Sequence, residues 1–235
     1  MSHYCVAVFS SQPDSSSFDR LLEPFSETDE RYFRFCPARD PEATWRRFLE
    51  NNPKNKISME DCLKNYYNMI IKDGVWGYMC NPNAKWDWYT LDGKDYLYEP
   101  KIGEKLDEDA FFYRKSQIDF DSSYVQQDKQ QAAYFWDHYV EGKPIQEGQV
   151  KPQDFYKPAY YLERYGTRER YIRHMTSSAP YAFITPDGIW HAPGDVGWFG
   201  VSDEGPESLD RHIEEWQAFL NSPDDPYVSF VDCHI

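Results

Sequence analysis

The densest group of side chains able to hold a ligand lies in residues 81–89, which read NPNAKWDWY. As a β-strand, this segment places Trp86 and Trp88 on one face and Lys85 and Asp87 on the other. One interpretation is structural, with two core tryptophans and a solvated Lys–Asp pair. The other is a polar pocket with aromatic walls that holds a nucleotide-like ligand. In that interpretation the nearby ligand-binding residues are Asn83, Lys85, Trp86 and Lys94, and Asp87 is a candidate acid–base group.

A second candidate lies in residues 185–191, which read TPDGIWH. His191 is a candidate general base, because the ordinary pKa of histidine allows proton transfer near neutral pH. Trp190 is a candidate stacking wall for the same nucleotide-like ligand. The alternative is that His191 is a hydrogen-bonded structural histidine at the end of a hairpin. The three glycines that follow, at positions 194, 197 and 200, do not have the spacing of a dinucleotide or phosphate loop.

Acidic residues gather in 202–225, where eight acids face one arginine and give a charge of −7. Such a block can occupy a cationic channel on a partner and compete with phosphate for it. The alternative is a solvated face or a network of salt bridges within the chain. The candidate partner-binding residues are Glu207, Asp210, Glu214 and Glu215.

The two ends of the chain carry His3, Cys5, Cys233 and His234, which together suggest zinc. Cys233 and His234 are neighbours and point to opposite faces of a strand, so at most three of the four ligands converge. We therefore expect no metal site and no cofactor, and buried cysteines in neighbouring strands. The five cysteines never occur as CxxC, which favours free thiols and a reducing, cytoplasmic environment.

Composition excludes several classes of protein. The 235 residues carry a formal charge of −15 and a pI of about 4.8, which argues against direct binding of nucleic acid or an anionic membrane. No apolar run approaches the length of a membrane span, and no secretory signal is visible at residues 1–4. Ile, Leu, Val and Phe are scarce, but Phe, Tyr and Trp make up 18% of the chain and are spread along it. We therefore expect a folded core built on aromatic side chains.

The elements that must position these residues follow from periodicity and capping signals. Strands are expected near residues 4–9 and at 227–235, with a hairpin at 181–191. Helices are expected from Ser58 to about Ile71, over 154–174, and from Ser208 to about Leu220. This order predicts an α+β fold, with a mixed or antiparallel sheet, neighbouring terminal strands and flanking helices. We expect a single domain over 1–235, with a helical elaboration at about 122–174.

The strings NPNAKWDWY, ITPDGIWH with GWFG, and the terminal VDCHI resemble an uncharacterised family of proteins encoded by bacteriophages and prophages. The motifs occur in the same order and, with weaker helical stretches, span most of the chain. In that family a Gly-Gly-Arg-Trp turn follows WDWY, whereas here residues 91–95 read LDGKD. If the family arginine holds an anion, Lys94 does not reproduce its bidentate grip. The resemblance implies a phage or prophage setting and names no activity.

Three functions from different classes follow. The first is a phage or prophage accessory protein that acts by binding, as an inhibitor of a host defence system through its acidic surface. The second is a nucleotide-binding sponge or enzyme that uses the Trp, Lys, Asp and His residues above. The third is a virion assembly protein. We expect either a host defence protein or a nucleotide as the partner, and the sequence leaves the oligomeric state open.

Overall fold

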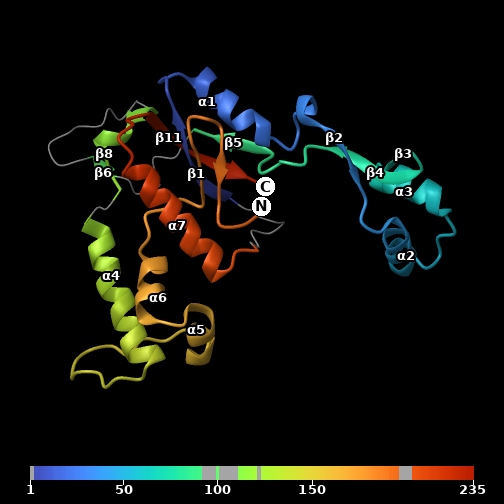
Figure 1. The fold of residues 1–235 in the computed structure, drawn as a ribbon. Helices are drawn as coiled ribbons and strands as arrows, with labels where there is room; N and C mark the ends of the chain where they lie inside the picture. Colours follow the sequence, from blue (N-terminus) through green and yellow to red (C-terminus); the bar gives the residue numbers. More distant parts are fainter. Residues whose placement is uncertain (1–2, 92–98, 101–110, 121–122, 196–202) are drawn as a thin grey trace. The chain divides into compact units, whose positions relative to one another are not determined.

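The computed structural model describes residues 3–91, 99–100, 111–120, 123–195 and 203–235. The chain divides into two compact units (Figure 1). Unit 1 consists of Met1–Leu21 and Tyr89–Ile235, and unit 2 consists of Leu22–Trp88. The expectation of one domain over the whole chain stays a prediction, because a compact unit need not fold independently.

Unit 1 is built on a mixed sheet in the order β10-β9-β1-β11-β5, with β7 also paired to β11. Its longest strands are the first and last of the chain, which pair antiparallel from His3 opposite His234 to Ser10 opposite Tyr227. On its other side β1 pairs in parallel with β9. The strands of this sheet are β1 (His3–Ser10), β5 (Trp88–Thr90), β7 (Tyr113–Arg114), β9 (Ala182–Ile184), β10 (Trp190–His191) and β11 (Tyr227–His234). The predicted α+β class with adjacent terminal strands is confirmed.

The helix α7 (Pro206–Leu220) lies against the sheet of unit 1 (Figure 1). Aromatic side chains fill the core between them. Trp216 of α7 is fully buried, and its ring contacts those of Phe9, Phe120 and Phe183 at centroid distances of 5.2–5.9 Å. The prediction that Ser208 caps this helix is wrong by three residues. Gly205 is the N-cap and Pro206 is the first helical residue. The Ser208 hydroxyl accepts from the Gly205 backbone N–H and donates to the Gly205 carbonyl.

A second aromatic cluster holds together the helices between residues 123 and 175. Trp136, Tyr161, Tyr165 and Tyr171 are its largest buried members. The helix expected over 154–174 is two helices, because Gly166 has a φ of 73° and Thr167 caps the next helix through its side chain. The elements here are α4 (Ser123–Phe135), the π-helical turn η5 (Trp136–Val140), α5 (Pro158–Tyr165) and α6 (Arg168–Met175). Unit 1 also contains α1 (Ser15–Leu22), η4 (Lys115–Gln117), and the paired strands β6 (Glu99–Pro100) and β8 (Ile118–Asp119).

Unit 2 has a three-stranded antiparallel sheet in the order β2-β4-β3 and two helices. The helix that begins after Ser58 ends at Tyr67, before the expected Ile71. Asn68 takes the left-handed conformation there, and a two-residue turn at Asp73-Gly74 makes 70–80 a hairpin. The elements are η1 (Glu23–Phe25), η2 (Glu30–Tyr32), β2 (Arg34–Pro37), α2 (Pro41–Asn51), α3 (Met59–Tyr67), β3 (Ile70–Lys72) and β4 (Val75–Cys80).

No helix in the described part of the chain is long and apolar enough to cross a membrane.

Candidate functional site

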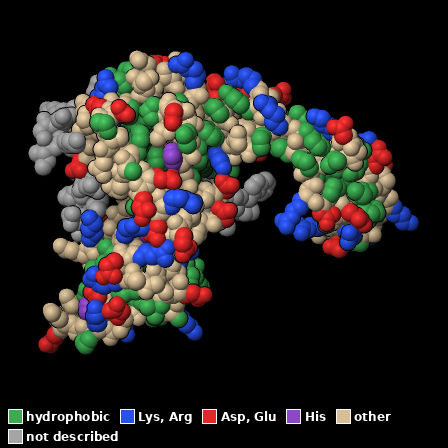
Figure 2. Space-filling model, viewed as in Figure 1, with side chains coloured by type: hydrophobic (Ala, Val, Ile, Leu, Met, Phe, Trp, Pro, Cys, Tyr) green, Lys and Arg blue, Asp and Glu red, His purple; other side chains and the backbone are tan. Residues whose placement is uncertain are grey.

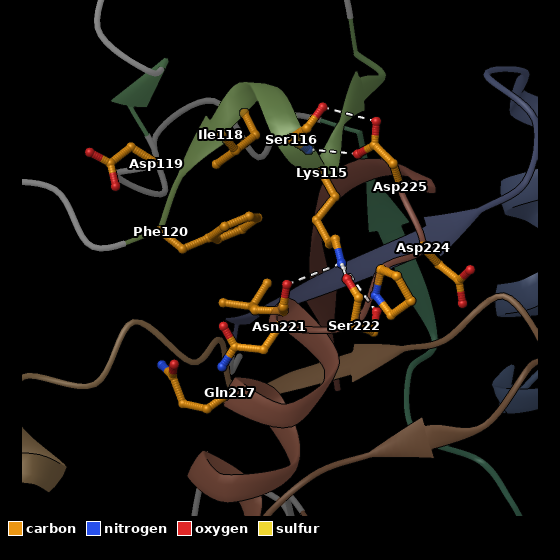
Figure 3. Close-up of a pocket in the computed structure, with 12 residues that line it drawn as sticks. Lys115, Ser116, Ile118, Asp119, Phe120, Gln217, Asn221, Ser222, Asp224 and Asp225 are labelled. Atoms are coloured by element: carbon orange, nitrogen blue, oxygen red, sulfur yellow. Dashed lines mark hydrogen bonds between the residues drawn. The ribbon is translucent and has the colours of Figure 1, made fainter.

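A cavity of about 350 Å³ lies at the C-terminal end of α7, between that helix and residues 115–120 (Figure 3). Lys115 points into its centre, and Ile118 and Phe120 form an apolar wall. Gln217 and Asn221 line the opposite side.

The Lys115 ammonium is already occupied by acceptors. Its Nζ donates to the carbonyl oxygens of Phe219 at 3.3 Å, Leu220 at 3.1 Å and Ser222 at 2.9 Å. The Ser222 hydroxyl lies 3.2 Å from the same nitrogen. Phe219 and Leu220 are the last two residues of α7, and Ser222 follows the helix. The Phe219 carbonyl also accepts from the Ser222 backbone N–H at 3.1 Å, so Lys115 serves mainly the Leu220 and Ser222 carbonyls. A cation is also favoured at this end of a helix by the helix dipole. Lys115 is therefore a cap of α7.

A carboxylate fixes the segment that carries Lys115. Asp225 accepts from the backbone N–H of Ser116 at 2.7 Å and from its hydroxyl at 2.9 Å. Arg114 donates to the Asp225 carbonyl at 2.8 Å and lies over the Tyr227 ring at 3.8 Å. These contacts brace η4 against the connection from α7 to β11, so the cavity is a structural junction. The sequence analysis missed it, because nothing near Lys115 distinguishes a buried lysine from a solvated one.

We expect Lys115→Met to lower the free energy of unfolding by about 2 kcal/mol, because the part-buried carbonyls of Leu220 and Ser222 lose the donor that Lys115 supplies. The matched control is Lys64→Met, on an exposed turn of α3 where Lys64 pairs with Glu60. We expect it to change stability by less than about 0.5 kcal/mol. Urea unfolding measures both, and equal effects of the two variants would contradict the capping role.

The four acids predicted to bind a partner lie on α7, and each contacts a basic side chain of the same chain. Glu207 and Asp210 pair with Arg170, and Glu214 pairs with Arg173. Glu215 pairs with His191 at 3.0 Å. Figure 2 shows acidic and basic side chains interspersed over α6 and α7. The network of salt bridges that we set beside the partner hypothesis is therefore present.

Asp210 is the centre of this network. It accepts from Arg170 at 2.6 Å, from His174 at 2.7 Å, and from Arg173. Burial alone raises the pKa of the Asp210 carboxyl, but hydrogen bonds from His174, Arg173 and Arg170 outweigh it and lower the pKa to about 2. The three partners lie on α6 and Asp210 lies on α7, so Asp210 joins the two helices. The His174 side chain at this contact is fully buried. Of the four candidate acids, Glu207 and Glu214 have the most exposed side chains, at 83% and 69%.

The candidate base His191 is packed and hydrogen-bonded. Its ring stacks on Phe183 at 4.4 Å, nearly parallel, and its Nδ1 faces Glu215. Trp190 precedes it on β10 and lies opposite Ile184 of β9. These contacts agree with the structural interpretation of His191. Its role as a general base stays a prediction.

The candidate segment 81–89 is a turn rather than the expected strand, and β5 begins only at Trp88. Trp86 is buried and its indole N–H donates to the Leu22 carbonyl at 3.2 Å, whereas Trp88 is 41% exposed. The two tryptophans therefore differ in environment and do not share a core face. Asn81, which the sequence analysis did not select, fixes the turn by donating to the carbonyls of Pro24 and Ser26.

The predicted ligand residues fall into separate groups. Asn83, Lys85, Trp86 and Asp87 lie together in the turn of unit 2, where Asp87 accepts from the Trp88 backbone N–H at 2.8 Å. Trp190 and His191 belong to the sheet of unit 1. Lys94 lies outside the described residues. The nucleotide site that combines all of these residues stays a prediction.

The cysteines differ from the expected five free thiols. Cys36 of β2 and Cys80 of β4 form a disulfide with their Cα atoms 6.4 Å apart, within the range that this bond requires. Cys5, Cys62 and Cys233 are free and buried. Burial, with a smaller contribution from Asp232, raises the pKa of the Cys5 thiol to about 12. No group of three or more His, Cys, Asp or Glu in the described ranges is arranged to hold a metal ion.

A surface that the sequence analysis missed lies in and before α5, and we call it the α5 aromatic surface. It consists of three exposed aromatic side chains in mutual contact, Phe155, Tyr156 and Tyr160. Phe155 is 91% exposed, and the Tyr156 and Tyr160 rings stack at 4.3 Å. The available signal was the run of aromatic residues at 155–161, which we assigned to an ordinary helix.

The backbone beneath this surface is pinned. The Tyr139 hydroxyl donates its proton to the Tyr156 carbonyl at 2.7 Å and lies 3.2 Å from the Asp154 carbonyl oxygen. The buried Tyr161 donates to the Asp154 carboxylate, and this hydrogen bond lowers the pKa of that carboxyl. Phe155 is therefore presented outward from a segment that is tied to the aromatic cluster on both sides.

Comparison of the chain with models of protein families, with curated proteins and with solved structures finds no match.

Proposed function

We propose that this chain is a phage or prophage accessory protein that acts by binding, and that it inhibits a host defence protein. The observation that carries the binding function is the α5 aromatic surface. Exposed apolar residues are common singly, but a contiguous group is typical of an interaction site. Aromatic side chains held in place by packing are the usual anchors of such sites, because little conformational entropy is lost when they bind.

The charge of unit 1 indicates the chemistry of the partner. Unit 2 contains 10 basic and 11 acidic residues, so nearly all of the chain's −15 charge, about −14, belongs to unit 1. Such a field accelerates association with a positively charged protein surface and disfavours a second copy of the same acidic unit. We therefore propose a basic protein with an apolar pocket as the occupant of the α5 aromatic surface. The setting in phage biology rests on the resemblance of the sequence motifs.

Of the four α7 acids that the sequence suggested as partner-binding residues, we propose that only two contribute to binding. Asp210 joins two helices and Glu215 contacts His191, so reversing the charge of either would disturb the fold. Glu207 and Glu214 are exposed enough to contribute to the attractive field. Charge reversal restricted to Glu207 and Glu214 therefore tests steering without removing the clamp at Asp210.

The first experiment is native mass spectrometry of protein purified gently from host cells that carry defence systems. We expect a host protein held in fixed ratio, and the bare chain or a homodimer alone would contradict the proposal. A retained small molecule would favour the nucleotide hypothesis instead.

With that partner identified, we expect Phe155→Ser with Tyr160→Ser to weaken its binding about tenfold to thirtyfold, as loss of interface anchors does. The matched control is Ile189→Ser, which removes an apolar side chain, 52% exposed, from the β9–β10 turn. Binding that is equally strong in the double variant and the control would exclude the α5 aromatic surface. Glu207→Lys with Glu214→Lys should slow association and reduce its salt dependence.

A further inference from the structure

A second cavity, of about 500 Å³, lies in the groove between α6, α7 and the middle of α4. Glu169, Ile172 and Arg173 line it from one face of α6, at i, i+3 and i+4, and the C-cap residue Thr176 follows on the same face. Ile213 and Gln217 line it from α7, and Lys129 lines it from α4. All of these elements belong to unit 1.

The floor of this cavity is apolar and its rim is polar. Ile172 and the well-buried Ile213 supply the aliphatic surface. Ser177 accepts from the Ala179 backbone N–H at 3.1 Å, which leaves its hydroxyl proton to donate. Ser178 accepts from the Trp216 indole at 3.3 Å. Thr176 donates back to the Ile172 carbonyl at 2.8 Å, so its hydroxyl proton is occupied.

The charged groups around the cavity differ in whether they are already paired. Arg173 contacts Asp210 and Glu214 and is neutralised by them. Lys129 and Glu169 are exposed and, in the part of the chain that the structure describes, form no salt bridge within 4 Å, although the Glu169 carboxylate also attracts the neighbouring Arg168. The cavity therefore presents one cation and one anion beside an apolar floor, with the Gln217 amide as a further donor and acceptor.

We propose that this cavity binds a small zwitterion with an apolar side chain, of the amino-acid type. Its carboxylate pairs with Lys129, its ammonium pairs with Glu169, and its side chain covers Ile172 and Ile213. A simple carboxylate would leave Glu169 beside a like charge, and a simple amine would do the same at Lys129. This site is independent of the α5 aromatic surface and of any protein partner.

Three probes with one phenylethyl body separate the charges: L-phenylalanine, 3-phenylpropionate and 2-phenylethylamine. Each is titrated at constant ionic strength into the isotope-labelled full chain, and NMR follows the backbone amides of 176–179 and the Trp216 indole N–H. We expect saturable shifts with L-phenylalanine, with a Kd on the order of 1 mM for a ligand of this size. The two singly charged probes should bind more weakly. Absence of saturable shifts, or equal or tighter binding of either singly charged probe, would overturn the proposal.

Two variants test the assigned charges. Lys129→Met should weaken L-phenylalanine binding about fivefold and leave 2-phenylethylamine no worse, while Glu169→Gln should weaken L-phenylalanine similarly and leave 3-phenylpropionate no worse. Lys151→Met and Glu163→Gln are the matched controls, because both residues are exposed and lie outside the cavity. Equal losses in the controls, or none in the test variants, would overturn the assignment. Near-UV circular dichroism verifies that all four variants keep the native packing.

Discussion

Replacing Cys36 and Cys80 together by alanine should lower the stability of unit 2 by about 4 kcal/mol. The two cysteines are 44 residues apart in the sequence, and a cross-link of that span removes about this much conformational freedom from the unfolded chain. Unit 2 contains only the residues from Leu22 to Trp88, and a core of that size gives little reserve of stability. We therefore expect this double variant to have the largest effect of the changes considered, measured as a shift of the urea unfolding midpoint.

Counting the reactive cysteines verifies the disulfide on which this prediction depends. Alkylation of the denatured chain without reductant should modify three cysteines, and five after reduction, as the disulfide and three free thiols require. Adding a reductant should reproduce the loss of stability in the wild-type chain and change nothing in the double variant. Modification of all five cysteines before reduction would contradict the disulfide.

The disulfide makes the stability of unit 2 depend on the redox state of the compartment that holds the protein. Disulfides persist in oxidising compartments and are rare in a reducing cytoplasm. In a reducing compartment unit 2 would lose the cross-link that joins β2 to β4, so its stability there should match that of the double variant. The cytoplasmic location that we expected from the cysteine pattern stays a prediction.

Asp210→Asn should have the second largest effect, a loss of about 3 kcal/mol. Removing the carboxylate takes away the acceptor of the fully buried His174 side chain and leaves Arg170 with the exposed Glu207 at 3.5 Å, which is the costly way to break an internal ion pair. The matched control is Glu207→Gln, because Glu207 contacts the same Arg170 at 3.5 Å but is well exposed. It should cost less than about 0.5 kcal/mol. Similar effects of the two variants would show that Asp210 is not the joint between α6 and α7.

The same carboxylate gives a pH dependence with a defined sign. The pKa of Asp210 falls from 3.8 to about 2 on folding, so its contribution to stability is complete above about pH 4. That contribution disappears as the pH falls from about 4 toward 2, and amounts to roughly 2 kcal/mol. Asp210→Asn should remove this part of the acid sensitivity, which paired urea titrations at pH 5 and about pH 2.5 would detect. A variant with the same acid sensitivity as wild type would contradict the assignment.

The sequence by itself determined the fold class and the pairing of the terminal strands. The apolar run at 4–9 and the pattern at 227–235 are signals carried by adjacent residues, and β1 and β11 form where they occur. The hairpin at 181–191 and most of α7 follow in the same way from a turn and a 3.6-residue period. The sequence predicted the ends of helices less accurately, because a single residue such as Asn68 or Gly166 ends a helix that its neighbours favour.

Only the tertiary structure decided what the polar and charged residues do. Asp210 meets Arg170 across 40 residues of sequence, and Lys115 meets the end of α7 across more than a hundred. Charge patterns show that a residue is acidic, but the partner that neutralises it comes from a distant segment. The same applies to Trp86 and Trp88, which are alike in the sequence and differ in burial. Function rests on which side chains remain unpaired after folding, and that depends on long-range contacts that local periodicity does not encode.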